Sequence, residues 1–141
     1  QLFSKAFENY RKSNTEGLRY FLQSHSEVKE GLRKLFELAV DEAIKDKEKK
    51  GCFVVNTTTE LIPNDSNLIH ILKENKDNLE QLFLEYLSSG VKNGQISANK
   101  DLKAICSLLY IFYNGLRVVT KIEASKVKLD NSIDVFLAVL D

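Results

Sequence analysis

Apolar residues recur at three- and four-residue intervals along nearly the whole chain, the spacing that places them on one face of an α-helix. The first such stripe begins at Leu2 and Phe3 and resumes at Leu18, after a weaker stretch around Asn14 and Gly17. We expect either one long helix here or a kinked pair of helices.

The clearest stripe occupies residues 28–44 and follows Ser24 and Glu27. A serine followed three residues later by a glutamate is a capping-box pattern, in which each side chain accepts a hydrogen bond from the other residue's backbone N–H. The pattern predicts a helix whose N-terminus is capped by Ser24.

A long stripe over residues 68–91 follows Pro63, the one proline in the chain. Asp65 is a suitable N-cap for this helix, since its carboxylate can accept from the first free N–H groups. Asn93-Gly94 is a suitable end, because glycine readily adopts the left-handed conformation that closes many helices.

Two further helices are predicted at the C-terminal end. Residues 102–119 are apolar on nearly every face, which predicts a helix surrounded by other elements, with Asn99 as its N-cap. Ser125 is expected to cap a last helix that carries the apolar residues from Leu129 to Leu140. The elements together predict an all-α chain that forms a single domain over residues 1–141.

Residues 51–62 are the one segment whose local propensity points away from helix, because β-branched residues crowd it. Taken alone, the segment would be a strand. A lone strand would have no partner elsewhere in this chain, and unpaired backbone groups in a compact core are costly. The context therefore favours a short buried helix.

Composition limits the classes of function. The chain has 141 residues, 43% of them hydrophobic, which suffices for one core, and its 20 basic and 20 acidic residues leave no net charge to attract DNA or an anionic membrane. We expect no direct DNA binding by this segment. No stretch approaches about 18 uninterrupted apolar residues and no signal-peptide layout is present, so a cytoplasmic protein is expected. The absence of any methionine, even at the start, suggests a fragment.

Metal, cofactor and catalytic patterns are missing from the sequence. Cys52 and Cys106 form no CxxC pair, and neither His25 nor His70 is near them, so no metal site and no cofactor are expected. Both cysteines are expected to be buried free thiols. No Ser-His-Asp arrangement, glycine-rich phosphate loop, paired-carboxylate motif or HExxH is present, which argues against an enzyme.

Three segments resemble the TetR/AcrR family of transcriptional regulators. Gly51 to Asn56, followed by Glu60-Leu61, resembles the family's Gly-Cys-apolar-apolar-x-Asn-x-x-x-Glu-Leu stretch, and Gly115-Leu116-Arg117-Val118 resembles its Gly-Leu-Arg segment on the penultimate helix. The opening from Leu2 to Tyr10 is similar to the segment that follows the family's helix-turn-helix. The matches occur in the right order over nearly the whole chain.

The resemblance implies a multi-helix orthogonal bundle like the TetR C-terminal domain, in which residues 51–62 form a helix and the last two helices form a four-helix bundle with those of a second subunit. It implies a ligand-responsive transcriptional regulator, a repressor, whose domain binds a small hydrophobic or amphipathic effector and dimerises. Operator DNA would be contacted by a helix-turn-helix domain located before Gln1. The alternative is a helical protein-binding or scaffold module with no role in transcription.

An effector pocket requires apolar walls and a few polar groups that orient the ligand. Asn56 and Glu60 are four residues apart, so on a helix they share one face and could meet a polar ligand group. Structural roles remain open for both, since Asn56 could bind a neighbouring helix's backbone and Glu60 could form an ion pair with Arg117.

Four polar-tipped residues in segment 102–119 recur at three- and four-residue steps: Tyr110, Tyr113, Asn114 and Arg117. On an otherwise apolar helix these groups need partners, which either the pocket or the subunit interface could supply. Phe53 and Tyr86 complete the predicted ligand-binding set. Aromatic residues at helical spacing are more often plain core, but six could wall the cavity: Phe7, Tyr10, Phe36, Phe53, Phe83 and Tyr86.

The predicted pocket and the predicted interface each lead to an expectation about single residues. Tyr113→Ala or Asn56→Ala is expected to weaken effector binding without unfolding the domain. The dimer interface is expected to contain apolar residues of the last two helices: Leu108, Phe112, Ile133, Phe136 and Leu140.

Overall fold

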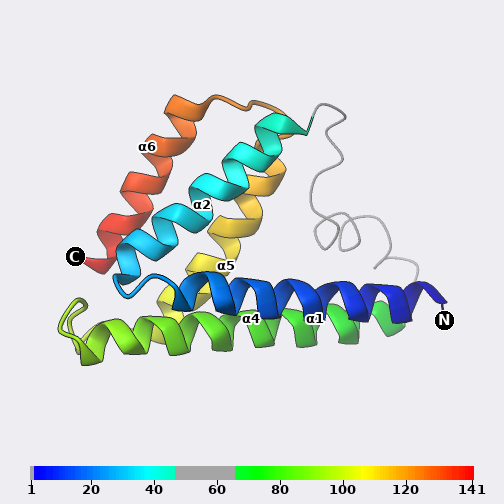
Figure 1. Cartoon of the computed structure of the whole chain (residues 1–141), viewed down its shortest axis with the longest axis horizontal. Helices are drawn as coiled ribbons and strands as arrows, with labels where there is room; N and C mark the ends of the chain where they lie inside the picture. The colour runs from blue at the N-terminus through cyan, green and yellow to red at the C-terminus, as the bar shows by residue number, and fades with distance from the viewer. Residues whose placement is uncertain (1, 47–65) are drawn as a thin grey trace.

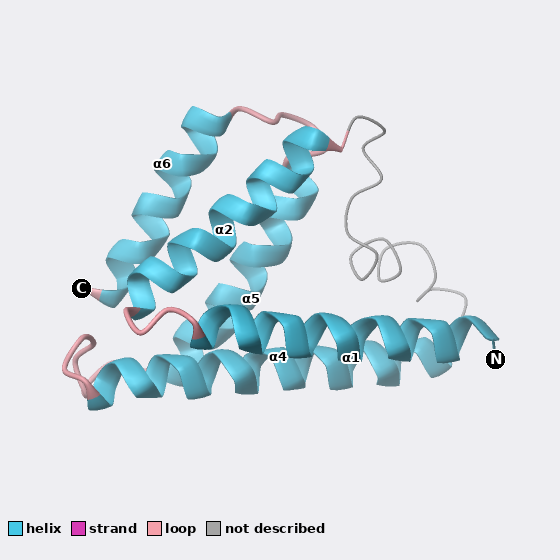
Figure 2. Ribbon diagram, in the orientation of Figure 1, coloured by secondary structure: helices cyan, strands magenta, loops and turns pink. Residues whose placement is uncertain are grey.

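The computed structural model describes residues 2–46 and 66–141, and for residues 2–4, 6–8, 10–11 and 66 it describes the backbone alone. Within these residues the secondary structure is entirely helical (Figure 2), as the sequence predicts. The elements are α1 (Leu2–Gln23), α2 (Val28–Lys45), α4 (Ser66–Lys92), α5 (Leu102–Val119), α6 (Lys126–Leu137) and the short 3₁₀ helix η2 (Ala138–Leu140). The predictions for residues 51–62 and for Asp65 lie outside the described residues.

The helices form two layers that cross. α1 and α4 lie side by side and run in the same direction, while α2, α5 and α6 stand across them (Figure 1). α2 contacts α1, α4, α5 and α6, so it occupies the centre of the bundle. The arrangement confirms the predicted orthogonal bundle, and α1 is one continuous helix through the weak stretch at Asn14 and Gly17.

Local signals located two helix boundaries correctly. Gly94 has φ 75°, and the backbone N–H of Gln95 donates to the carbonyl oxygen of Gly90 at 2.8 Å, which closes α4 at the predicted place. Ser125 caps α6, accepting from the backbone N–H of Lys128.

Two predicted caps are wrong. The N-cap of α5 is Asp101, whose carboxylate accepts from Ala104 N–H at 3.1 Å, because the helix begins at Leu102, three residues beyond Asn99. The N-cap of α2 is Glu27, and Ser24 instead donates its hydroxyl to the carbonyl oxygen of Phe21 at 2.6 Å. Ser24 therefore belongs to the end of α1, not to the start of α2.

Aromatic rings form the centre of the core. Phe36 of α2 is fully buried, and its ring lies edge-on to Phe112 of α5 at 5.0 Å and to Phe136 of α6 at 5.4 Å between centroids. Phe112 and Phe136 are stacked at 4.7 Å, so three helices meet at one cluster. Edge-on and offset pairs of this kind stabilise beyond the area they bury.

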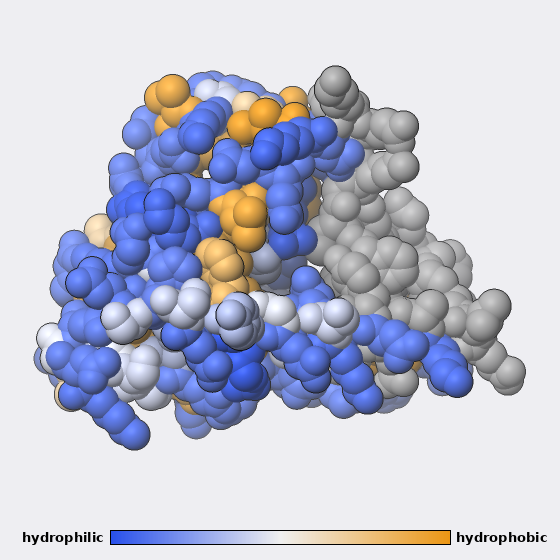
Figure 3. Space-filling view, in the orientation of Figure 1, coloured by the Kyte–Doolittle hydropathy of each residue, from blue (hydrophilic) through white to orange (hydrophobic). Residues whose placement is uncertain are grey.

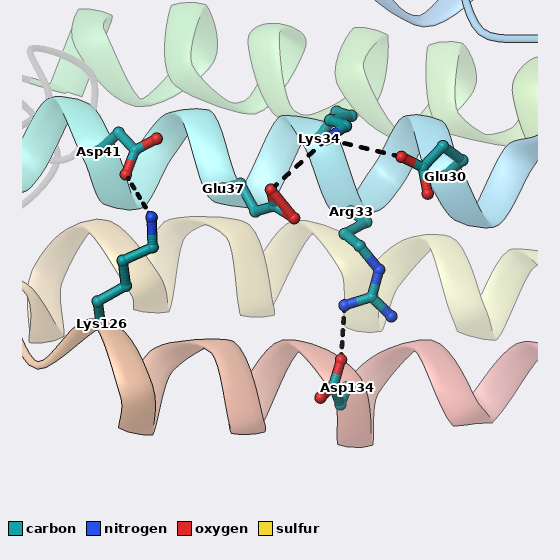
Figure 4. Close-up of polar contacts among 7 residues, drawn as sticks. All are labelled: Glu30, Arg33, Lys34, Glu37, Asp41, Lys126 and Asp134. Atoms are coloured by element: carbon teal, nitrogen blue, oxygen red, sulfur yellow. Dashed lines mark hydrogen bonds and ion pairs between the residues drawn. The ribbon is translucent and has the colours of Figure 1, made fainter.

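Ion pairs connect the outer sides of α2 and α6 (Figure 4). Asp41 lies 3.5 Å from Lys126, and Arg33 donates to Asp134 at 2.5 Å. All four side chains are exposed, so each pair contributes at most about 1 kcal/mol. The buried residues beneath the pairs, not the pairs themselves, hold α6 against α2.

One side of α5 is left uncovered in the described structure, although the sequence predicts a surrounded helix. Leu108 and Ile111 are 41% and 65% exposed, and Val118 and Val119 continue the same face. By length and composition, α5 is also apolar enough to cross a membrane, although the sequence analysis predicted no membrane span. Within the bundle, 28% of its residues are buried. In the view of Figure 3, apolar surface appears over α2 and the start of α6, whereas α1 is mostly hydrophilic.

Candidate functional site

The connection between α1 and α2 is held tightly by residues from the end of α4. The Tyr86 hydroxyl donates to the carbonyl oxygen of His25 at 2.7 Å and lies 3.3 Å from that of Glu27. The Gln95 side chain accepts from the N–H of Val28 at 2.7 Å and donates to the carbonyl oxygen of Ser26 at 2.9 Å. We call Tyr86, Gln95 and residues 24–28 the corner.

Two glycines allow the helices to approach at the corner. A Cβ on Gly31 would lie 1.9 Å from the Tyr86 hydroxyl, and one on Gly90 would lie 2.8 Å from a methyl of Val28. Burial raises the pKa of Tyr86 to about 12, so its hydroxyl stays protonated and keeps its donor role. Tyr86, predicted to bind ligand, is thus placed at this corner with its hydroxyl bound to backbone.

Farther from the corner, α1 and α2 separate around a cavity of about 490 Å³ that α5 closes on one side. Such a volume is within the range of about 300–1,000 Å³ that accommodates a drug-sized ligand. Apolar side chains from α1 and α2 form much of its wall, with polar groups at its edges. The described lining residues are Ser13, Asn14, Gly17, Leu18, Phe21, Leu35, Leu38, Ala39, Glu42, Tyr113 and Arg117.

Tyr113 and Arg117 form the polar part of the α5 wall. The Arg117 guanidinium donates to the Tyr113 hydroxyl and lies 4.5 Å from the centroid of its ring, a cation–π contact. The Tyr113 ring also packs toward Phe36 and Phe83. Two of the predicted ligand-binding residues therefore lie together at one cavity.

The other two members of the predicted stripe are used differently. The Asn114 side chain donates to the carbonyl oxygen of Tyr110 at 2.9 Å, within its own helix. Tyr110 is half-buried, and Lys76 of α4 lies 5.7 Å from the centroid of its ring. Neither residue lines the described cavity.

The remaining predicted ligand residues, Phe53, Asn56 and Glu60, lie outside the described residues, as do the side chains of Phe7 and Tyr10. Phe36 and Phe83 are core residues. The sequence analysis did not predict the cavity residues of α1 and α2. The interruption of the apolar stripe at Asn14 and Gly17 could have indicated them, since both residues line the cavity. Asn75 was also not singled out from the sequence; it is a buried amide whose nitrogen has no hydrogen-bond partner among residues 2–46 and 66–141.

The five predicted interface residues divide into two groups. Leu108 is exposed on α5, and Phe112 is half-buried in the aromatic cluster. The other three face the interior of the chain and offer almost no surface to a partner: Ile133, Phe136 and Leu140 are 1%, 5% and 2% exposed. Val127 and Val135 on α6 and Val139 on η2 remain accessible.

Cys106 is a free, buried thiol, as predicted, whereas Cys52 lies outside the described residues. Burial, assisted by the negative charge of Glu80, raises the pKa of the Cys106 thiol to about 12, so it carries little thiolate at neutral pH and is a poor nucleophile. Among the described residues no three of His, Cys, Asp and Glu converge in a way that could hold a metal ion.

Comparison with known proteins identifies the family. Residues 29–136 match the family described as "Tetracyclin repressor-like, C-terminal domain". The chain belongs to the TetR family. The TetR match covers α2, α4, α5 and most of α6, so it includes two of the three helices that surround the cavity.

Two transcriptional regulators are similar over nearly the full chain. The uncharacterized HTH-type transcriptional regulator YezE of Bacillus subtilis is 28% identical over 99% of this chain and 73% of its own length. A cysteine mutant of the TetR family regulator CifR, solved with operator DNA, superposes with a TM-score of 0.82 at 22% identity, over 97% of this chain and 72% of its own. The second likeness shows the fold.

Membership in the TetR family decides between the two functions that the sequence left open. The family match supports a TetR-family transcriptional regulator over a scaffold without a role in transcription. Its relatives are transcriptional regulators, a class of protein that performs no catalysis.

Proposed function

We propose that this chain is the effector-binding and dimerising domain of a ligand-responsive TetR-family repressor in the cytoplasm. The observation that carries the proposal is the cavity between α1, α2 and α5, where apolar walls meet the Tyr113–Arg117 pair. A small hydrophobic or amphipathic effector binds there and favours one position of α1 over another. The shift requires unequal affinity for the two states of the protein.

The second part of the proposal is a homodimer through the uncovered faces of α5 and α6. The exposed apolar residues of α5 are separated by three and seven residues, about one and two helical turns, and thus share one helix face. They are Leu108, Ile111 and Val118, and the apolar surface is continued by Ile122 in the turn after α5, by Val127 and Val135 on α6 and by Val139 on η2. Covering them in a four-helix bundle removes apolar surface from water.

Operator DNA is contacted, in this proposal, through a helix-turn-helix domain joined to the N-terminal end of α1. The balanced charge of the present chain fits this division of labour, because binding to phosphates needs a basic surface. YezE is named an HTH-type regulator, and CifR was solved with operator DNA.

A matched pair of α2 variants tests the cavity. Leu38 and Ile44 are both 43% exposed, but only Leu38 lines the cavity. In a titration with the neutral fluorescent probe N-phenyl-1-naphthylamine, Leu38→Asp should weaken binding about 10-fold or more, because it places a charge in an apolar wall. Ile44→Asp should leave binding unchanged. Absence of probe binding by the native protein, or equal loss in both variants, contradicts the proposed cavity.

Sedimentation tests the dimer. Ile111→Glu should convert a dimer at micromolar concentration into a monomer, because it places a charge in the centre of the apolar face. Tyr20→Glu is the control, since Tyr20 is 79% exposed on α1, away from that face. A native monomer at micromolar concentration would refute this part of the proposal.

A further inference from the structure

Gly17 lies in the middle of α1, where a glycine destabilises a helix by about 0.5–1 kcal/mol relative to alanine. Its backbone is helical, and among the described residues positive φ occurs at Gly94. A Cβ built on Gly17 would have no neighbour within 4 Å. Neither the backbone conformation nor crowding within the described chain accounts for a glycine at this position.

Three other glycines have such an explanation, whereas Gly115 of α5, like Gly17, has no atom within 4 Å of an added Cβ but does not line the described cavity. Gly31 and Gly90 allow close approach to Tyr86 and to Val28, and Gly94 adopts the left-handed conformation that ends α4. At Gly17 the space that a side chain would enter is the cavity, which Gly17 lines together with Leu18 of α1 and with Leu35 and Leu38 of α2.

We propose that Gly17 is a specificity-determining position of the effector cavity, whose bare backbone on α1 leaves room for the bulky apolar body of the ligand. The inference rests on the proposed function and adds a size criterion to it. The ligand it implies is mostly apolar and of drug size, since Leu18, Leu35 and Leu38 supply the surrounding wall. A side chain at position 17 narrows this space and excludes the largest ligands first.

A single substitution at Gly17 should therefore raise the stability of the protein and lower its affinity for the ligand. Gly17→Ala raises helix propensity without a clash, so its Tm should increase by about 2–4 °C. The same methyl group occupies part of the cavity, and affinity for N-phenyl-1-naphthylamine should fall about 10-fold. Gly17→Leu should abolish binding of this probe while the protein stays folded.

Glu16→Ala is the matched control. Glu16 is exposed on α1 next to Gly17 but does not line the cavity, so both Tm and probe affinity should remain near the native values. The role of Gly17 would be overturned if the native protein binds the probe, Leu38→Asp weakens binding, and both Gly17→Ala and Gly17→Leu bind as tightly as the native protein. That result would leave the proposed function standing. Native protein that does not bind the probe would overturn both.

Discussion

α1 meets α2 in two different ways along its length. At the corner, Leu22, Val28 and Leu32 are buried, and Tyr86 and Gln95 satisfy the backbone groups of the connection. Farther along α1 from the corner, the two helices line an open cavity with Gly17 in its wall. The pair α1 and α2 is therefore fixed at the corner and has free volume farther along. This arrangement would allow α1 to shift when a ligand binds while its connection to α2 stays in place.

The largest expected effect comes from closing the space at the corner. Gly31→Ala should destabilise the protein by about 2–3 kcal/mol, because the added Cβ displaces a Tyr86 ring that packing and hydrogen bonds hold in place. Urea unfolding at one fixed protein concentration measures the change. Gly17→Ala is the corresponding substitution at the cavity and should increase the free energy of unfolding. If both substitutions changed the free energy of unfolding equally, the contrast between the two regions would be wrong.

Tyr86→Phe should cost about 1–3 kcal/mol at neutral pH, because it leaves the carbonyl oxygen of His25 without its buried donor. The pKa of Tyr86 is raised from 10.0 to about 12 in the folded protein, so its contribution is complete below pH 10 and is lost as pH rises toward 12. The difference in stability between native protein and Tyr86→Phe should shrink over that interval. A difference that stays constant would show that the hydroxyl is not the group responsible.

Gln95→Ala should cost about 1 kcal/mol, since it removes the acceptor for Val28 N–H and the donor to Ser26. Gln95→Glu keeps the acceptor and places a negative charge at the N-terminus of α2, where it is favourable, so it should retain most of the stability. If both variants unfold at the same urea concentration as the native protein, the Gln95 contacts do not hold the corner.

The sequence predicted those parts of the fold that neighbouring residues determine. Helical periodicity identified α1, α2, α4, α5 and α6, and Gly94 and Ser125 marked real helix boundaries because a cap depends on only a few consecutive residues. At the start of α2, the backbone N–H of Val28 donates to the side chain of Gln95, which is 67 residues away in the chain. The sequence analysis therefore missed this contact and assigned the cap to Ser24. No local pattern contains that contact.

The candidate site was predicted less completely for a related reason. Tyr113 and Arg117 could be selected because polar groups are conspicuous on an apolar helix, whereas Leu18, Leu35 and Leu38 look like any other core residues in the sequence. Which face of an apolar helix is buried also depends on tertiary packing. Phe136 was therefore placed at the interface, although it completes the aromatic cluster inside one chain.

The structure also changes how Tyr113 should be tested. Its ring packs toward Phe36 and Phe83, so Tyr113→Ala would leave a hole in the core and confuse loss of binding with loss of stability. Tyr113→Phe keeps the ring and removes the hydroxyl that accepts from Arg117. An effector that needs the orientation of Arg117 should bind this variant more weakly at nearly unchanged Tm.

Amide hydrogen exchange with and without N-phenyl-1-naphthylamine tests the central claim most directly. Ligand in the cavity should slow exchange in residues 13–21 of α1 and 35–42 of α2, while the residues of the corner, 24–28 with Tyr86 and Gln95, stay as protected as before. Protection confined to the outer face of α5, or no change in α1 and α2 at saturating probe, would contradict the assignment of this cavity as the effector site.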